Sequence, residues 1–155
     1  SHPHMLEELI GKKQIDYVAM DIKNAPGKYQ ETTGLAVEGA YAEASDMAFP
    51  VKAVQQSVEL LKNCTIPYEF RTTVVKEFHT QQELKEICVW IAGCSAYYLQ
   101  QFEDSGQLIA EMEVSVEKHM IFHAYEEAEI KRIAEHLNHI PGMEGKVHLR
   151  GMNGK

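Results

Sequence analysis

The sequence predicts an α/β fold built on one parallel sheet. Segments with apolar residues three and four positions apart alternate along the chain with short runs of β-branched and aromatic residues. The resulting order of elements repeats helix then strand from one end to the other. Such an order is typical of βαβ units, whose strands run parallel. Periodicity alone leaves open whether the sheet is open or part of a barrel.

The strand expected at 16–23 is the most informative element. It is apolar almost throughout, which predicts burial on both faces of the sheet. Alternation of side chains places Ala19, Asp21 and Lys23 on one face. Ligand groups in parallel sheets lie at the carboxyl ends of the strands, so Asp21 and Lys23 are candidate binding residues.

The other elements follow from local signals in chain order. Helices are expected at 3–11, 51–64, 81–92 and 124–140, with Pro50 at the start of the second. Thr80 and Glu83 form a capping-box pattern in front of the third helix. Strands are expected at 68–75, 96–102 and 147–150. On the first of these, alternation places Glu69, Arg71, Thr73 and Val75 on one face. Residues 24–50 are rich in glycine and proline and are expected to form a long loop.

The composition of the chain argues against two classes of partner, nucleic acids and membranes. The 155 residues are enough for one domain, 1–155, and a formal charge of −8 argues against a nucleic-acid partner. No apolar run approaches the roughly 20 residues that cross a bilayer, so no membrane partner is expected. The three cysteines have no disulfide-framework spacing, which favours a reduced, cytoplasmic setting.

Four strings of residues at successive strand positions carry a resemblance to a known family. They are DYVAMDIK at 16–23, YEFRTTVV at 68–75 with His79-Thr80 after it, YLQQF at 98–102 and VHLRG at 147–151. Together they resemble the later part of radical S-adenosylmethionine proteins that activate glycyl radical enzymes, of the anaerobic ribonucleotide reductase and pyruvate formate-lyase branches. The resemblance implies a partial (β/α) barrel of the radical S-adenosylmethionine type, with this chain supplying its strands 4 to 6 and a terminal strand.

The resemblance also implies a reaction and a site. In this family a [4Fe-4S] cluster cleaves S-adenosylmethionine to a 5'-deoxyadenosyl radical, which removes a hydrogen atom from a glycine of the partner enzyme. Asp21 and Lys23 match the family's D-x-K motif, which lies against S-adenosylmethionine, and Arg71 faces the same lumen. The further cofactor-binding candidates are Thr73, His79 and Gln100, the last preferred over Gln101.

Two features of the family pattern are missing. The cluster is held there by C-x3-C-x2-C, a spacing that Cys64, Cys88 and Cys94 do not have, and the glycine-rich GGE segment is absent as well. The expectation is therefore the carboxyl-terminal part of a longer activating enzyme, with no catalytic residue or metal ligand of its own and no activity alone.

Other interpretations stay open at this point. The chain could be a non-catalytic protein-binding or structural α/β domain, or an unrelated enzyme with an aldolase-like Lys23, which Asp21 would keep protonated. Asp21 and Lys23 could form only an ion pair at a strand end, and His79 could be a plain surface residue. The partner of Arg71 is Glu69, Asp21 or a ligand carboxylate. If the earlier strands of the barrel are missing, the strand at 16–23 becomes an edge of the sheet with unpaired backbone groups. Such an edge predicts pairing with a second copy of the chain, in a homodimer.

Overall fold

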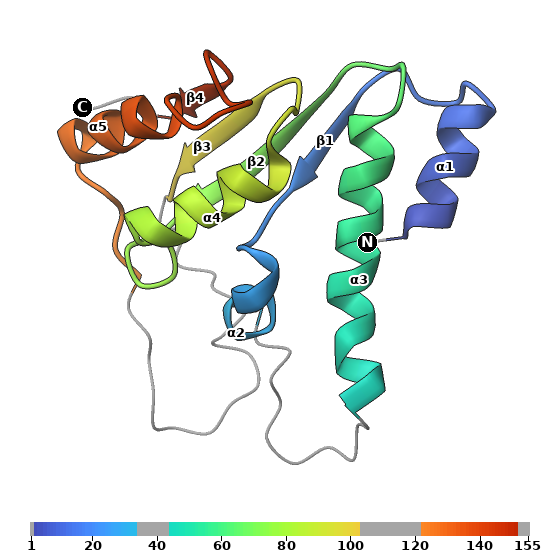
Figure 1. Cartoon of the computed structure of the whole chain (residues 1–155), viewed down its shortest axis with the longest axis horizontal. Coiled ribbons are helices and arrows are strands. Elements are labelled where there is room, and N and C mark those ends of the chain that lie inside the picture. Colours follow the sequence, from blue (N-terminus) through green and yellow to red (C-terminus); the bar gives the residue numbers. More distant parts are fainter. Residues whose placement is uncertain (1, 34–43, 103–121, 152–155) are drawn as a thin grey trace.

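The structure is a computed structural model that describes residues 2–33, 44–102 and 122–151 (Figure 1). Its elements, in chain order, are α1 (Pro3–Gly11), β1 (Val18–Asp21), η1 (Pro26–Lys28), α2 (Tyr29–Thr33), α3 (Ala44–Lys62), β2 (Tyr68–Val74), α4 (Gln81–Ile91), β3 (Tyr97–Gln101), α5 (Glu127–Leu137) and β4 (Val147–Arg150). The expected alternation of helices and strands is confirmed.

The strands form one four-stranded parallel sheet in the order β1-β2-β3-β4. The predicted fold class, α/β with a parallel sheet, is therefore confirmed. The register sets Asp21 beside Arg71, and Thr73 beside Gln100, which in turn lies beside Arg150. Because neighbours in register point to the same face, this pairing decides which side chains can meet.

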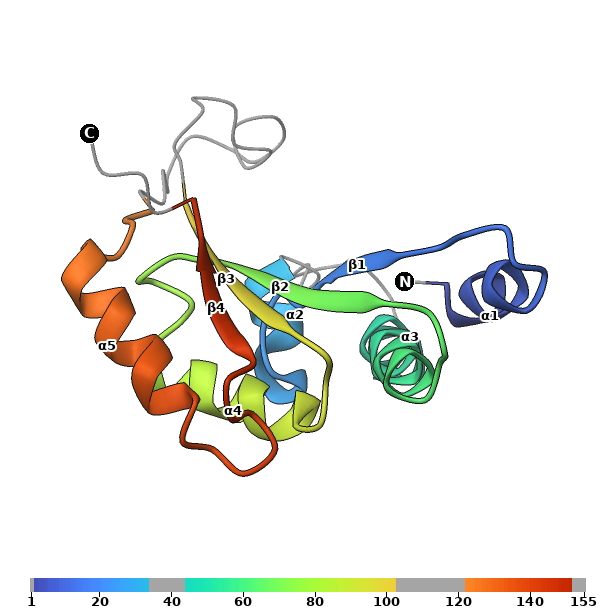
Figure 2. The same cartoon turned by 90° about the horizontal axis from the view of Figure 1, so that it is seen from above.

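The two faces of the sheet differ. Helices α3, α4 and α5 lie on one side of it (Figure 2), and the core there includes the fully buried Phe70, Leu84 and Leu99. On the other side, Ala19 and Asp21 are exposed. We call this side the open face. The expectation that strand 16–23 is buried on both faces was wrong, because these helices cover only one of them.

Helix boundaries show where local rules held. The capping box is present, with the Thr80 hydroxyl accepting from the Glu83 amide and the Glu83 carboxylate accepting from the Thr80 amide. Helix α3, in contrast, begins at Ala44 and continues through Pro50. The expected start at residue 51, with Pro50 just before it, was wrong because proline removes only one hydrogen bond of the helix interior, which a long helix can absorb.

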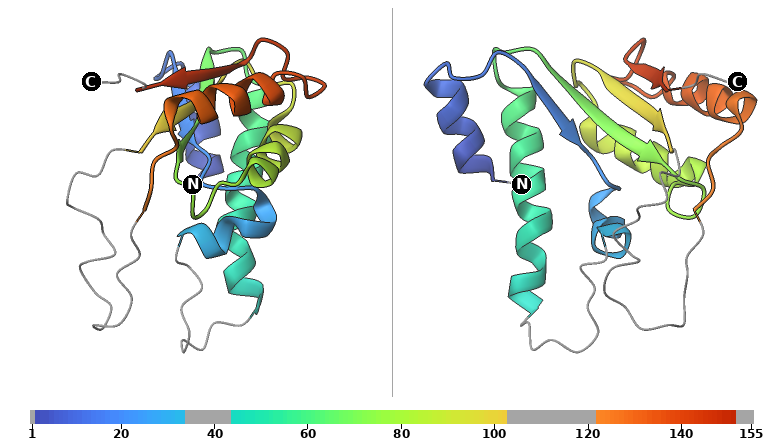
Figure 3. Two further views of the ribbon diagram at one scale, coloured as in Figure 1. Left: turned by 90° about the vertical axis from the view of Figure 1, so that its left-hand side faces the viewer. Right: turned by 180° about the vertical axis from the view of Figure 1, so that it is seen from behind.

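The segment expected to be one long loop at 24–50 contains η1, α2 and the first turns of α3, while 34–43 lie outside the described residues. Helix α2 follows the carboxyl end of β1, and the carboxyl ends of β1 and β2 point to the same end of the sheet (Figure 3). Among the described helices, none has both the length and the hydropathy needed to cross a membrane.

Candidate functional site

The centre of the candidate site is the carboxylate of Asp21, at the carboxyl end of β1. One carboxylate oxygen accepts a hydrogen bond from Nε of Arg71 at 3.0 Å and lies 2.8 Å from Nη2 of the same guanidinium in an ion pair. The other oxygen accepts from Nζ of Lys23 at 3.1 Å. We call Asp21, Lys23 and Arg71 the charge cluster. It carries one more positive than negative charge.

The charge cluster is accessible. The side chains of Lys23 and Asp21 are 50% and 42% exposed and that of Arg71 is 30% exposed. Partial burial raises the pKa of Asp21, but hydrogen bonds and charges from Lys23 and Arg71 outweigh it, so the pKa is held below its usual value. Asp21 therefore stays ionised at neutral pH and keeps both cations oriented toward the open face.

Thr73 and Gln100 lie next to the charge cluster. They are register partners on β2 and β3, and Thr73 is exposed, so Gln100 points to the open face. This is the face on which the sequence places Gln100, with Gln101 directed to the other side. The structure thus brings together five of the six predicted site residues: Asp21, Lys23, Arg71, Thr73 and Gln100.

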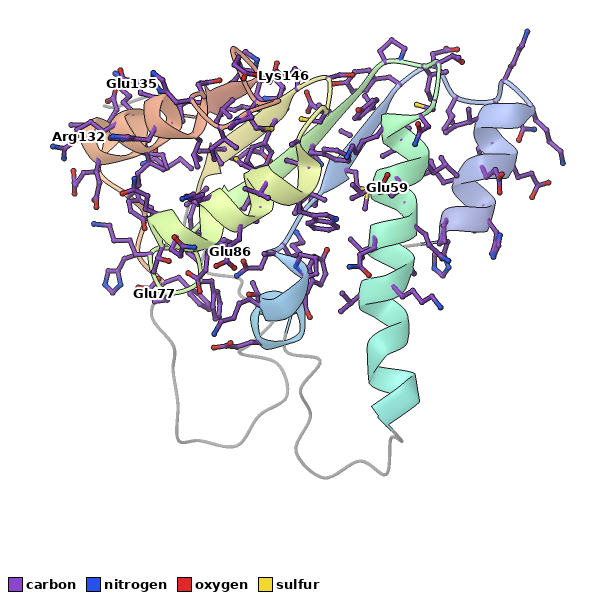
Figure 4. All side chains as sticks on the ribbon, in the orientation of Figure 1. Glu59, Glu77, Glu86, Arg132, Glu135 and Lys146 are labelled. Atoms are coloured by element: carbon purple, nitrogen blue, oxygen red, sulfur yellow. The ribbon has the colours of Figure 1, made fainter. Side chains whose placement is uncertain are left out.

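The sixth predicted residue, His79, is placed elsewhere. It lies in the connection from β2 to α4, which also carries Glu77 (Figure 4), and it is only 3% exposed. Its Nδ1 accepts from the Val75 amide at 3.1 Å, and its Nε2 lies 2.7 Å from the Lys23 carbonyl oxygen. Both ring nitrogens are occupied by backbone groups, so His79 reaches the charge cluster only through the backbone of Lys23.

A second polar cluster on the open face was missed by the sequence reasoning. Glu69 accepts from both terminal nitrogens of Arg150, at 2.6 and 2.9 Å, and the Arg150 guanidinium lies 3.9 Å from the centre of the Tyr98 ring. Glu69 also hydrogen-bonds Tyr17, which raises the pKa of that phenol. Alternation already placed Glu69 on the face of Arg71, and the same rule applied to 147–150 would have placed Arg150 there.

The charge cluster fits the amino-acid end of S-adenosylmethionine. Lys23 and the remaining N–H groups of Arg71 can donate to a carboxylate, and Asp21 can accept from an ammonium group. Thr73 and Gln100 add a hydroxyl and an amide within the same surface. The cluster's excess positive charge favours a ligand that carries a carboxylate.

The cysteines do not fit a [4Fe-4S] cluster. Cys88 and Cys94 are buried in the core under the sheet, and burial raises the pKa of Cys88 to about 12, whereas iron ligands must be thiolates. In the described ranges no three His, Cys, Asp or Glu side chains come together as a metal site. The described cysteines are therefore not arranged as ligands of an iron-sulfur cluster.

We compared the chain with known proteins by sequence. No family model matches the chain. A Methanocaldococcus jannaschii protein, named as one of the glycyl-radical enzyme activating enzymes, is 31% identical over 103 residues, which are 66% of this chain and 40% of that protein. The chain thus spans about two fifths of the length of this relative.

A solved structure extends the comparison to the fold. A domain of a pyruvate-formate lyase-activating enzyme from Bacteroides vulgatus superposes with a TM-score of 0.57, covering 96% of this chain and 74% of that one, at 11% identity. At this identity the match shows the fold alone. The chain is therefore similar in sequence to one protein named as a glycyl-radical enzyme activating enzyme, and it has the α/β fold of a pyruvate-formate lyase-activating enzyme domain.

Proposed function

We propose that this chain forms the S-adenosylmethionine-binding face of a radical S-adenosylmethionine activating enzyme. The observation that carries the proposal is the charge cluster of Asp21, Lys23 and Arg71, which lies accessible on the open face, at the carboxyl end of β1 and beside it on β2. Ligands of parallel α/β proteins bind at this end of the sheet. The relationship to an activating enzyme supports the same assignment.

Each residue has a distinct role in this proposal. Lys23 and Arg71 bind the methionine carboxylate, Asp21 binds the ammonium group, and Thr73 and Gln100 contact the neighbouring part of the ligand. S-adenosylmethionine, once reductively cleaved, supplies a radical that takes a hydrogen atom from a glycine of the partner. We propose a glycyl radical enzyme of the anaerobic ribonucleotide reductase or pyruvate formate-lyase type as this partner, in an anaerobic cytoplasm.

The described cysteines do not fit the [4Fe-4S] cluster, so its ligands would have to come from outside the described residues. The chain alone should therefore bind S-adenosylmethionine without cleaving it. His79, which the sequence placed among the cofactor-binding residues, remains a candidate only through its bond to the backbone of Lys23.

The first expected result is that Lys23→Gln weakens S-adenosylmethionine binding by roughly 10- to 100-fold, the usual range for a lost hydrogen bond to a charged group. Isothermal titration of the chain measures this affinity. Adenosine lacks the amino-acid end, so its affinity should not change. Lys85→Gln is the matched control, because Lys85 is an exposed lysine of α4, on the opposite side of the sheet.

Two outcomes would contradict the proposal. Equal losses for Lys23→Gln and Lys85→Gln would show that binding is unspecific. No binding at all would favour the alternative, a non-catalytic protein-binding or structural domain. In the same preparation, iron, sulfide and a reductant should yield no 5'-deoxyadenosine.

We also propose that the chain self-associates through β1. In the described part of the chain this strand pairs only with β2, so its other side presents free backbone groups. The Val18 amide donates to the carbonyl of Pro67, just before β2, and the Ile22 amide donates to the carbonyl of Arg71 in β2. Backbone amides alternate between the two edges of a strand, so the Ala19 amide points away from β2. Ala19→Pro removes that donor without removing a bond of the sheet, and should weaken a dimer detected by light scattering. A protein that is monomeric at high concentration would contradict this.

A further inference from the structure

Three consecutive residues at the end of β1 are each tied to the next strand or to the connection after it. The Ile22 carbonyl accepts from the Thr72 hydroxyl at 2.7 Å, and the Lys23 carbonyl lies 2.7 Å from Nε2 of His79. The Asn24 side-chain amide donates to the Phe78 carbonyl at 2.9 Å. The side chains of Thr72, His79 and Asn24 that make these bonds are almost fully buried, so water competes little for their polar atoms.

The bonds of His79 fix its tautomer. Nδ1 accepts from the Val75 amide, so it carries no proton, and the ring proton must be on Nε2. Nε2 then donates to the Lys23 carbonyl. Burial lowers the pKa of His79, so the ring is neutral at pH 7. The imidazole is a rigid spacer between the connection after β2 and the residue that carries the ammonium group of the charge cluster.

The two cations of the charge cluster are held by different means. Arg71 lies inside β2, with strands on both sides, and its position follows from the sheet. Lys23 lies beyond the last residue of β1, where the sheet no longer holds it. Its backbone is positioned by His79 and by a hydrogen bond with Tyr29. Only one of the two cations therefore depends on His79.

We propose that His79 is a positioning residue, which holds the backbone of Lys23 so that its ammonium group lies beside Asp21 on the open face. The proposal rests on the assignment of the charge cluster as the S-adenosylmethionine site, and assigns His79 to its geometry instead of to ligand contact. It makes a selective claim: loss of the bond to Lys23 loosens the Lys23–Asp21 pair and leaves the Arg71–Asp21 pair intact.

Two substitutions of His79 each keep one of the two hydrogen bonds that its imidazole makes and remove the other. In His79→Asn, the side-chain oxygen takes the place of Nδ1 and can still accept from Val75, but nothing reaches Lys23. In His79→Gln, the side-chain nitrogen takes the place of Nε2 and can still donate to Lys23, but the Val75 amide loses its acceptor. Each variant loses one buried hydrogen bond, so the two are matched in the cost to stability.

The measurement is the titration of the Asp21 carboxyl by carbon NMR, with no ligand present. His79→Asn should raise the pKa of Asp21 toward its value in Lys23→Gln, because the ammonium group moves away, whereas His79→Gln should leave it near that of the unmodified chain. His136→Asn is the control, since the side chain of this exposed histidine bonds to the Arg132 carbonyl oxygen of its own helix, α5. An unchanged titration in His79→Asn, or equal shifts in His79→Asn and His79→Gln, would overturn the proposal.

A second measurement needs no variant. Nitrogen NMR of the unmodified chain at pH 7 should show a neutral ring with its proton on Nε2, and a proton on Nδ1 would overturn the proposal even if both variants failed to fold. S-adenosylmethionine affinity then separates the two claims. If the ligand binds, His79→Asn should lose affinity about as much as Lys23→Gln, and His79→Gln should not. If nothing binds, the function fails, while the Asp21 titration still decides the role of His79.

Discussion

Replacing Arg150 by alanine is expected to lower the free energy of unfolding by about 2 kcal/mol. Arg150 donates two hydrogen bonds to Glu69, whose side chain is only 6% exposed. Removing the guanidinium leaves a nearly buried carboxylate without its cation, which costs about 3 to 5 kcal/mol for fully buried pairs. The expected cost is smaller here because the Arg150 side chain is 40% exposed and water can reach the gap.

The pH dependence of this loss in the free energy of unfolding tests the role of the Arg150–Glu69 pair more specifically than the size of the loss does. The hydrogen bonds from Arg150 lower the pKa of Glu69 more than burial raises it. The pair therefore stabilises the protein above the ordinary pKa of glutamate, about 4.3, and the contribution is lost as the pH falls through the lowered pKa of Glu69. Denaturant unfolding at pH 7 and at acidic pH should show the difference between the two proteins shrinking on acidification.

A matched variant tests the cause. Glu69→Gln in the Arg150→Ala background removes the orphaned charge and should recover part of the lost stability at pH 7. Lys131→Ala is the surface control, because its partner Glu127 lies one helical turn away on the exposed face of α5, and such pairs contribute about 0.5 kcal/mol or less. Equal effects of Arg150→Ala and Lys131→Ala would contradict the assignment.

Replacing Thr72 by valine is expected to cost about 2 to 4 kcal/mol, although the two side chains have nearly the same shape. The Tyr97 hydroxyl donates to the Thr72 oxygen at 2.7 Å, and the Thr72 hydroxyl donates to the Ile22 carbonyl at 2.7 Å. Tyr97 is fully buried and Thr72 is 1% exposed. Valine breaks both bonds and leaves the phenol without an acceptor, and each orphaned buried group costs roughly 1 to 3 kcal/mol.

The double variant distinguishes lost bonds from lost packing. Thr72→Val with Tyr97→Phe removes donor and acceptor together, and should be more stable than Thr72→Val alone. Thr73→Val is the control on the same strand, because Thr73 is exposed and its substitution should change stability by less than about 0.5 kcal/mol. Chemical denaturation gives all three values. A double variant less stable than Thr72→Val would contradict the relay of hydrogen bonds.

Local sequence rules predicted much of the molecule. Alternation placed Asp21 and Lys23 on one face and, on the strand at 68–75, Glu69, Arg71 and Thr73 together. The capping box at Thr80 and Glu83 predicted where α4 begins. These features depend on residues a few positions apart, so the sequence alone contains them. The parallel sheet followed from the order of the elements, which the structure confirms.

What the sequence left open depends on contacts between distant residues. Whether Arg71 binds Glu69 or Asp21 was undecided, because Glu69 has a competing partner, Arg150, that lies 81 positions later in the chain. The burial of His79 was not predicted, because it depends on two backbone partners that are far apart in the sequence. Val75 follows β2, whereas Lys23 follows β1. Pairing and burial of this kind are set by the register of the sheet.

The sequence by itself therefore determined the α/β class and the side of each strand on which the polar residues lie, and it carried the resemblance to activating enzymes. Only the tertiary structure decided that the face with Asp21 is open, that Asp21 pairs with both Lys23 and Arg71, and that His79 is buried and bonded to backbone groups. The physical reason is that side-chain alternation is a property of one strand, whereas charge pairing and burial depend on which strands and helices become neighbours.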